Sequence, residues 1–256
     1  MGPLQFAGTL IFSFVTLVWL LSLVKQDAGI MDIFWGLGFV FTAILVPVRY
    51  DAWSSRGILV LALVIIWGIR LSIYIGYRNA GKPEDTRYQR WRLENGSNWW
   101  WKSYFKVFLL QGTIMWIVVL PVIFTLTGAG GGEINIIDYL GTTFWLTGMF
   151  FEVVGDWQLQ RFKADRANKG QILTSGLWHL TRHPNYFGEA VLWWGIYLVA
   201  VAAGHPLTII SPLLMTFLLV RVSGVRMLDE LMIRSKPGYA EYIKSVNAFL
   251  PGLPRR

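Results

Sequence analysis

A short polar stretch at the start of an apolar segment contains the residue types best suited to binding chemistry. It runs from Thr181 to Glu189 and reads Thr-Arg-His-Pro-Asn-Tyr-Phe-Gly-Glu. Asn185 and Glu189 are four residues apart, so a helix would place both on one face. Polar groups that enter a membrane are costly unless something pairs with them, which makes this stretch the first candidate binding site. Its other candidate residues are Arg182, His183 and Tyr186.

Polar and charged residues also interrupt or directly follow four other apolar segments. They are Asp32 in the second segment, Arg70 and Tyr74 in the third, Gln111 in the fourth, and Glu152, Asp156 and Lys163 along the fifth. A desolvated cavity of mixed charge that opens to the cytosol suits a polyanionic cofactor beside an apolar substrate. Basic loops would pair with its phosphates, while Asn and carboxylates would hold its amide, ribose or base groups.

Each of these residues also has a structural interpretation, which stays open. Asp32 could cap a helix, Arg70 could extend to the membrane surface, and Gln111 could hydrogen-bond between helices. Glu152 and Asp156 could pair with nearby basic residues and do nothing else.

The composition predicts a membrane protein. Hydrophobic residues make up 54% of the 256-residue chain and charged residues 15%. A soluble protein of this length cannot bury so much apolar surface. The sequence contains no Cys, which excludes disulfides and thiolate chemistry. Only three His occur, so we expect no metal site.

Seven apolar segments predict an all-α, polytopic membrane protein with seven transmembrane helices, organised as one domain over residues 1–256. The segments are 8–24, 30–48, 57–77, 104–127, 139–160, 186–203 and 206–225. Lys and Arg gather in the 78–106 and 161–184 connections and after residue 225, but are absent from the 128–138 connection. The positive-inside rule therefore predicts an outside N-terminus and a cytoplasmic C-terminus.

Two features that could indicate nucleotide or nucleic-acid binding have simpler explanations. The glycine-rich run 128–132 is not preceded by a strand and lies on the side without basic residues, so we expect an outer loop. The net charge of +8 comes mainly from the basic connections, and the run Trp99–Trp101 suits a membrane interface. We therefore expect no nucleic-acid partner.

From Thr181 to Glu189 the chain resembles the bacterial branch of the steroid 5-alpha-reductase C-terminal family of membrane reductases. The likeness extends to Asp32-Ile33-Phe34-Trp35-Gly36, Arg78-Asn79-Ala80-Gly81-Lys82, Gln111 and Lys236-Pro237-Gly238-Tyr239-Ala240-Glu241-Tyr242. Related sequences occur in sterol reductases, which use NADPH, and in isoprenylcysteine carboxyl methyltransferases, which use S-adenosylmethionine.

The resemblance implies seven helices that enclose NADPH from the cytosolic side and a lipid-accessible pocket for a steroid-like or isoprenoid substrate. It implies that Asn185 and Glu189 contact the cofactor, with Asp156 and Arg70 beside them. Glu152 stands where the family has an Asn. Lys163 keeps the charge of a basic family position but loses bidentate geometry. The other residues expected at the cofactor are Arg78, Gln111, Arg182, His183 and Tyr186.

The implied reaction is reduction of a carbon–carbon double bond conjugated to a ketone. Hydride passes to the β-carbon, and a donor at the carbonyl oxygen lowers the barrier because its bond strengthens as charge develops there. In the steroid enzymes a Glu and a Tyr polarise this ketone. Asp32 is the nearest candidate for the Glu, whereas Trp67 stands where the Tyr is expected. A protonated Asp32, or a nearby Trp67 or Tyr74, would then donate.

Two other functions stay open. The first is a methyltransferase of the isoprenylcysteine type, which shares the 181–189 motif. The second is a lipid transporter or lipid-binding protein without enzymatic activity, although the sequence lacks the duplicated halves that many transporters show. In each case we expect a monomer in a bacterial inner membrane.

Overall fold

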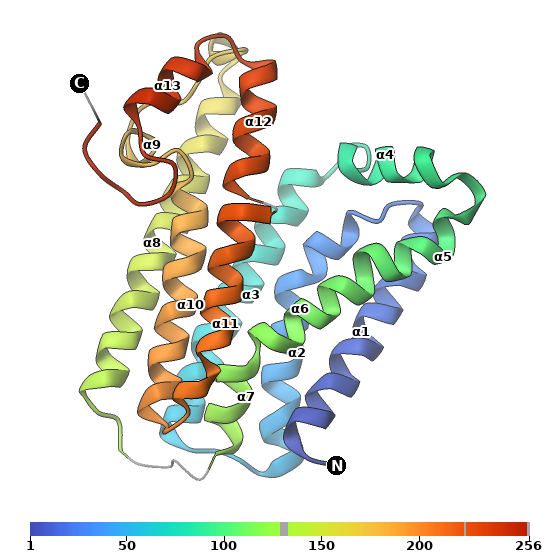
Figure 1. The fold of residues 1–256 in the computed structure, drawn as a ribbon. Helices are drawn as coiled ribbons and strands as arrows, with labels where there is room; N and C mark the ends of the chain where they lie inside the picture. Colours follow the sequence, from blue (N-terminus) through green and yellow to red (C-terminus); the bar gives the residue numbers. More distant parts are fainter. Residues whose placement is uncertain (129–132, 223, 255–256) are drawn as a thin grey trace. The chain divides into compact units, whose positions relative to one another are not determined.

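The computed structural model describes residues 1–128, 133–222 and 224–254, and every regular element within them is helical (Figure 1). The prediction of an all-α protein is therefore confirmed. Most of the glycine-rich run, residues 129–132, lies outside the described residues. The chain packs as two compact units: Met1–Ile134 with Val199–Thr208, and Asn135–Leu198 with Ile209–Arg256.

Helices account for nearly all of the first unit. In chain order they are α1 (Pro3–Lys25), α2 (Ile30–Tyr50), α3 (Ser55–Asn79), α4 (Thr86–Asn95), η1 (Gly96–Asn98), α5 (Trp99–Ser103), η2 (Tyr104–Leu109), α6 (Leu110–Val118) and α7 (Leu120–Thr127). The second half of the chain continues with α8 (Ile136–Ala164), η3 (Arg166–Asn168), α9 (Leu177–Leu180), α10 (Pro184–Ala202), η4 (Pro206–Ile209), α11 (Ile210–Phe217), η5 (Leu218–Val222), α12 (Val225–Ser235) and α13 (Tyr239–Ser245).

Several helices are long and apolar enough to cross a membrane. Four qualify by themselves: α1, α2, α3 and the helical stretch Pro206–Ser235. A fifth span results if Thr86–Val118 and Leu120–Thr127, which meet at a 46° bend, are counted together. Helices also occupy the predicted segments 139–160 and 186–203, but α8 contains buried carboxylates and α10 begins with the polar motif. The described residues thus contain four to five candidate spans, which is consistent with a multi-pass membrane protein, whereas the predicted seven spans are not confirmed.

Close backbone contact between α2 and α3 shapes the first unit. A Cβ atom added at Gly68 would lie 2.7 Å from the Gly36 carbonyl oxygen, so only glycine permits this approach. One layer further, the rings of Phe39 and Trp67 meet edge to face at 5.3 Å. The side chain of Ser54 begins α3 by accepting a hydrogen bond from the Gly57 amide. These contacts fix the α2 and α3 faces that carry Asp32 and Arg70.

A row of glycines brings α8 and α10 together in the second unit. Gly141, Gly148 and Gly155 recur every seven residues on α8, a spacing that returns them to nearly the same helix face. A Cβ atom at Gly148 would lie 2.5 Å from the Gly188 carbonyl oxygen, and one at Gly195 would lie 2.5 Å from that of Gly141. We call these positions the glycine seam.

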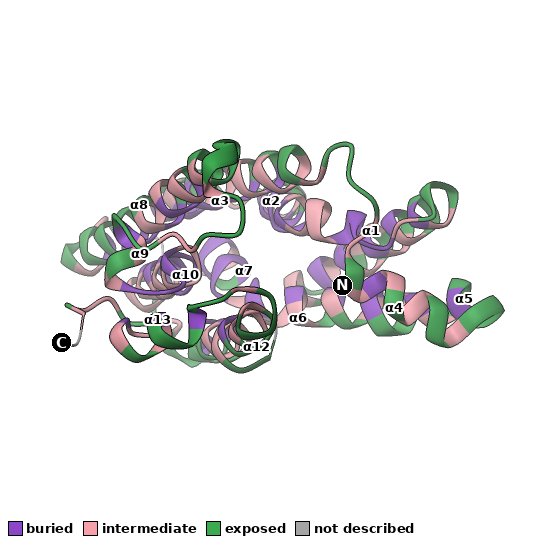
Figure 2. Ribbon diagram, turned by 90° about the horizontal axis from the view of Figure 1, so that it is seen from above, coloured by how far each residue is buried: buried purple, intermediate pink, exposed green. Residues whose placement is uncertain are grey.

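Buried and exposed residues divide within each unit as packing requires. Figure 2 shows buried residues on the helix sides that contact helices of the same unit, and exposed residues on the outer sides. Large hydrophobic side chains remain exposed on several helices, among them Leu17, Ile73, Phe144 and Phe217. Such surfaces are stable in lipid rather than in water.

Candidate functional site

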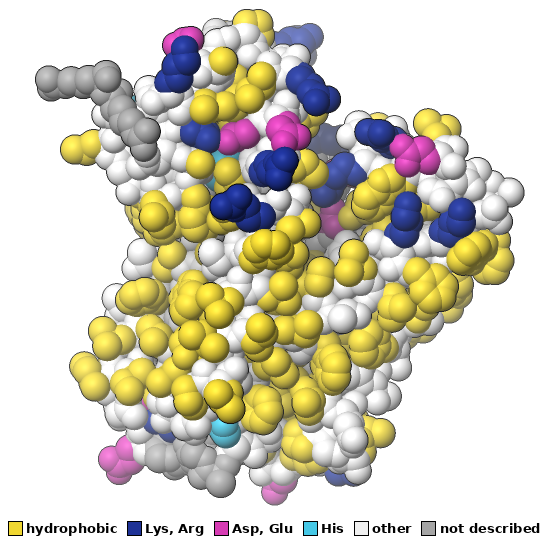
Figure 3. Space-filling view, viewed as in Figure 1, with side chains coloured by type: hydrophobic (Ala, Val, Ile, Leu, Met, Phe, Trp, Pro, Cys, Tyr) yellow, Lys and Arg dark blue, Asp and Glu magenta, His cyan; other side chains and the backbone are white. Residues whose placement is uncertain are grey.

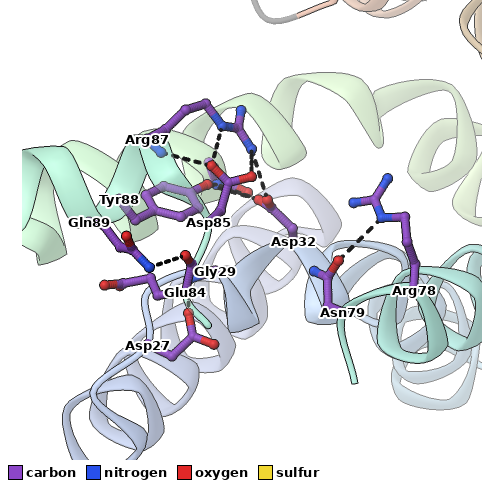
Figure 4. A network of polar contacts seen from close by, with 11 residues as sticks. Asp27, Gly29, Asp32, Arg78, Asn79, Glu84, Asp85, Arg87, Tyr88 and Gln89 are labelled. Atoms are coloured by element: carbon purple, nitrogen blue, oxygen red, sulfur yellow. Dashed lines mark hydrogen bonds and ion pairs between the residues drawn. The ribbon is translucent and has the colours of Figure 1, made fainter. Parts of the chain in front are cut away.

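Asp32 lies at the centre of a polar cluster in the first unit (Figure 4). Its carboxylate accepts a hydrogen bond from the Tyr88 hydroxyl at 2.9 Å and one from the Arg87 guanidinium at 3.3 Å. The Gln111 amide lies at 3.5 Å from the same carboxylate and at 3.4 Å from the Tyr88 oxygen. Together with Asp85, these residues form what we call the Asp32 cluster.

Asp85 orients Arg87 within this cluster. Its carboxylate accepts from both the backbone amide and Nε of Arg87, each at 2.9 Å. Burial alone would raise the pKa of the Asp85 carboxyl, but the hydrogen bonds and charge of Arg87 outweigh burial and hold that pKa below its usual value. Asp85 is therefore ionised at neutral pH, and it holds the Arg87 guanidinium beside the Asp32 carboxylate.

The Glu84 carboxylate connects α4 to the turn before α2. Glu84 accepts from the Ala28 amide at 2.7 Å and pairs with Arg92 at 2.9 Å. Arg92 also donates to the Gln26 carbonyl at 2.9 Å. The α1–α2 turn is thus tied to α4 by contacts that involve both backbone and side chains. Tyr88, which lies between Glu84 and Arg92 in the chain, is 4% exposed.

Two arginines flank one aromatic ring on α3. Arg70 lies 5.1 Å and Arg78 5.9 Å from the ring centre of Tyr74, which stands four residues from each. Guanidinium groups at this distance are attracted to the ring face. Arg78 also donates to the Asn79 side chain at 3.2 Å. The arrangement holds two cations on one side of α3.

The second unit contains a group of buried carboxylates and an amide. The Asn185 side chain donates to Asp156 at 3.1 Å and accepts from the Tyr186 amide at 3.1 Å. Glu152, Asp156 and Glu189 are 2%, 3% and 7% exposed. The glycine seam places them together, because a Cβ atom at Gly188 would lie only 2.7 Å from the Glu152 amide nitrogen. We call this set the amide–carboxylate group.

Asp229 on α12 organises a further cluster in the second unit. Its carboxylate accepts from Arg182 at 2.6 Å, from the Tyr239 hydroxyl at 2.7 Å, and lies 3.0 Å from Nε2 of His183. The His183 ring in turn stacks on Tyr186 at 5.6 Å. Burial, with the hydrogen bond to Asp229, raises the pKa of the Tyr239 hydroxyl above its ordinary value, so this group remains a donor. Asp229, Arg182, His183 and Tyr239 form what we call the Asp229 cluster.

The segment after α13 completes the surroundings of Arg182. The Arg182 guanidinium donates to the carbonyls of Ile243 and Val246 at 3.2 and 2.5 Å, and its backbone amide donates to Asn247 at 2.9 Å. Gly252 donates its amide to the Leu180 carbonyl at 3.0 Å. The residues just before α10 are therefore enclosed by the C-terminal segment.

Residues 18–246 match the family described as "Protein of unknown function (DUF1295)". The chain belongs to the DUF1295 family. The matched range contains the Asp32 cluster, the amide–carboxylate group and the Asp229 cluster of this DUF1295 protein.

One relative resembles the chain along nearly its full length. It is the uncharacterized protein C594.04c of Schizosaccharomyces pombe (strain 972 / ATCC 24843), which is 22% identical over 278 residues. The alignment covers 97% of this DUF1295 chain and 80% of the yeast protein. No solved structure matches.

The structure assembles the predicted site residues of this DUF1295 protein in part. It joins Asp32 to Gln111, and Asp156 to Asn185. Arg182 and His183, predicted at a cofactor, are both bonded to Asp229. Trp67, predicted as a donor, is fully buried in the core against Phe39. Lys163 is exposed near the end of α8. The described residues contain no group of three or more side chains suited to a metal ion.

Five residues of these clusters were not assigned to a site from the sequence: Asp85, Arg87, Tyr88, Asp229 and Tyr239. Arg87 and Tyr88 lie in a polar connection where no helical periodicity relates them to Asp32. Asp229 lies in the basic region after residue 225, whose charge we used only for orientation. The available signal was the motif Lys236–Tyr242, which contains the Asp229 partner Tyr239.

Proposed function

We propose that this protein is an NADPH-dependent membrane reductase that saturates the carbon–carbon double bond of an enone in a steroid-like or isoprenoid lipid. The observation that carries the proposal is the hydrogen bond of 2.9 Å from the Tyr88 hydroxyl to Asp32. Support also comes from the family, since DUF1295 proteins are related to steroid 5-alpha-reductase-like proteins.

Asp32 and Tyr88 form the acid–phenol pair that polarising a ketone requires. A hydrogen-bond donor at the carbonyl oxygen stabilises the enolate charge that develops when hydride arrives at the β-carbon. Tyr88 takes the donor role for which the sequence offered Trp67, because the Trp67 indole is enclosed by the core. A phenol has one proton, so Asp32 would be protonated in the reacting state and donate to the Tyr88 oxygen, which leaves the Tyr88 proton for the ketone oxygen. Gln111 and Arg87 hold the pair in position, and little reorganisation is then needed as charge develops.

The amide–carboxylate group has a composition that suits a nicotinamide nucleotide. Asn185 can bind the nicotinamide carboxamide, and the carboxylates of Glu152, Asp156 and Glu189 can accept from ribose hydroxyls. Their burial excludes water, which strengthens such hydrogen bonds. The bound nucleotide supplies the hydride; orientation and water exclusion come from these residues.

The remaining cofactor residues have roles set by charge and position. Lys163, in the same unit as the amide–carboxylate group, supplies a cation for a phosphate. Arg182 and His183 act through the protein, because Asp229 engages both and thereby orients the start of α10 and Tyr186. We further propose seven transmembrane helices forming one domain, a cytoplasmic nucleotide entrance, a monomeric state and a bacterial inner-membrane location. In this proposal α8 and α10 are the spans beyond the recognisable four to five. Their polar residues explain why they do not qualify by length and composition alone.

The cofactor assignment is tested by titration calorimetry of the full chain in detergent. We expect NADPH to bind and S-adenosylmethionine to give no heat. Asn185→Ala and Glu189→Ala should each weaken NADPH binding by about 10- to 100-fold, the worth of a hydrogen bond to a charged or buried group, and abolish NADPH-dependent turnover. Gln171→Ala, at an exposed side chain, is the matched control. Binding of S-adenosylmethionine instead would establish the methyltransferase alternative, and binding of neither nucleotide would favour a non-enzymatic protein.

The donor assignment predicts a loss in rate without a loss in cofactor affinity. Tyr88→Phe keeps the ring but removes the hydroxyl, so the rate of enone reduction should fall about 100-fold, as for loss of one oxyanion donor. The NADPH affinity should stay unchanged. Tyr77→Phe, whose ring is 70% exposed on α3, should retain full activity. An unaltered rate for Tyr88→Phe in steady-state kinetics would remove Tyr88 from the mechanism.

A further inference from the structure

The connection between α3 and α6 contains more cations than its carboxylates can neutralise. Its three acidic residues are each paired with an arginine: Glu84 with Arg92 at 2.9 Å, Asp85 with Arg87 at 2.9 Å, and Glu94 with Arg90 at 2.8 Å. Three basic residues of this connection have no carboxylate partner within the described residues: Lys82, Lys102 and Lys106. Lys82 donates to the Arg78 carbonyl at the end of α3, whereas Lys102 and Lys106 lie on α5 and η2.

Aromatic rings hold both of these lysines in place. Nζ of Lys102 lies 5.8 Å from the Trp101 ring centre and 3.2 Å from the Asn95 side-chain oxygen. Nζ of Lys106 lies 5.5 Å from the Trp91 ring centre. Each ammonium group therefore lies near an aromatic ring and has no carboxylate partner among the described residues. A π-helical turn spans Tyr104–Leu109, so the helix is locally widened at Lys106, a feature that recurs at functional sites.

The same segment exposes large aromatic side chains. Trp100, Trp101 and Phe105 are 57%, 40% and 56% exposed. Trp19 anchors this segment to α1, because its indole donates to the Trp100 carbonyl at 3.0 Å and its ring meets that of Tyr104 at 5.0 Å. Exposed tryptophans that adjoin apolar spans are stable at the headgroup level of a bilayer. In Figure 3, Lys and Arg side chains gather over α4 and α5 beside hydrophobic side chains of the same unit.

We propose that Lys102 and Lys106 bind the phosphate of an anionic phospholipid, whose glycerol and upper acyl chains contact Trp100, Trp101 and Phe105. Charge decides the occupant, since two unneutralised ammonium groups at headgroup depth complement a net negative headgroup and not a zwitterionic one. Aromatic residues can occupy the membrane interface without lysines beside them, so the two lysines favour an anionic ligand. The site is separate from the proposed enone and nucleotide residues, so it does not depend on the reductase assignment.

Native mass spectrometry of the full chain, released from detergent with added lipid, tests the proposal. We expect phosphatidylglycerol to be retained about 30-fold more strongly than phosphatidylcholine, which corresponds to about 1 kcal/mol for each lysine near an anionic surface. The double variant Lys102→Gln, Lys106→Gln should lose this preference. The double variant Lys169→Gln, Lys244→Gln removes the same charge at exposed positions of the other unit and should keep it. Equal phosphatidylglycerol retention in both double variants would overturn the site.

A measurement on the unmodified chain covers the case in which the variant fails to fold. Raising the salt concentration from about 0.1 to about 1 M shortens the screening length from about 10 to about 3 Å. Retention of phosphatidylglycerol should then fall towards that of phosphatidylcholine, which should not change. Phosphatidylglycerol binding that is insensitive to salt would contradict the electrostatic basis of the proposal.

Discussion

Replacing Asp229 with alanine is expected to destabilise the second unit by about 3–5 kcal/mol, because it leaves a buried charge without its partner. The Arg182 side chain is 7% exposed and its closest carboxylate oxygen, on Asp229, lies at 2.6 Å. His183 and Tyr239 lose their acceptor in the same substitution. A destabilisation of this size lowers the thermal midpoint by roughly 6–20 °C, which thermal unfolding of the detergent-solubilised chain measures.

The adjacent residue provides a matched control. Glu230 pairs with Arg226 four residues away, but both side chains are more than half exposed, at 57% and 71%. Exposed pairs of this kind contribute about 0–1 kcal/mol, so Glu230→Ala should barely move the midpoint. Asp229→Asn keeps one acceptor oxygen and should fall between the two. Equal midpoints for Asp229→Ala and Glu230→Ala would show that Asp229 does not stabilise the unit.

Replacing Gly148 with valine is expected to prevent the close approach of α8 and α10. A Cβ atom there would lie 2.5 Å from both the Gly188 carbonyl oxygen and the Leu192 amide nitrogen. These are backbone atoms, so no side-chain rotation relieves the overlap and the two helices must separate. We expect a cost of more than about 3 kcal/mol, at the upper end of overpacking effects, with loss of monodisperse protein in size-exclusion chromatography.

Thr147 tests whether the helix position or the added volume causes this effect. It is the residue before Gly148, is exposed, and its hydroxyl donates to the Thr143 carbonyl at 2.8 Å. Thr147→Val adds no atom towards α10 and should elute as the unmodified protein does. A monodisperse Gly148→Val variant would mean that the glycine seam tolerates separation and does not fix the amide–carboxylate group.

Local patterns predicted more of the fold than of the candidate site. Apolar runs located the helices, because each run must bury or embed its backbone hydrogen bonds together. Two four-residue spacings, Glu152 to Asp156 and Asn185 to Glu189, each predicted two polar residues on one helix face. Those faces contain Asp156 and Asn185, which the structure brings into contact. The number of spans could not be read from the apolar runs in the same way. α8 and α10 are long enough to cross a membrane, but they contain buried polar residues and do not qualify as candidate spans.

Contacts between distant segments were beyond the reach of periodicity. Tyr88 and Asp32 are 56 residues apart, and Asp229 and Arg182 are 47 apart. Neither pair shares a helix, so no spacing rule relates its members. The prediction for Trp67 shows a related difficulty. Its place in the family pattern gave its position in the chain, but it did not show that its ring is buried in the core.

The enclosure of Arg182 by residues from Ile243 to Asn247 has a consequence for biosynthesis. Its hydrogen-bond acceptors are translated about sixty residues after the arginine itself, as the 61- and 64-residue separations to Ile243 and Val246 require. During that interval Arg182, directly before α10, lacks these acceptors. The polar motif at the start of α10 can therefore reach its final hydrogen bonding only after residues 243–247 have been made.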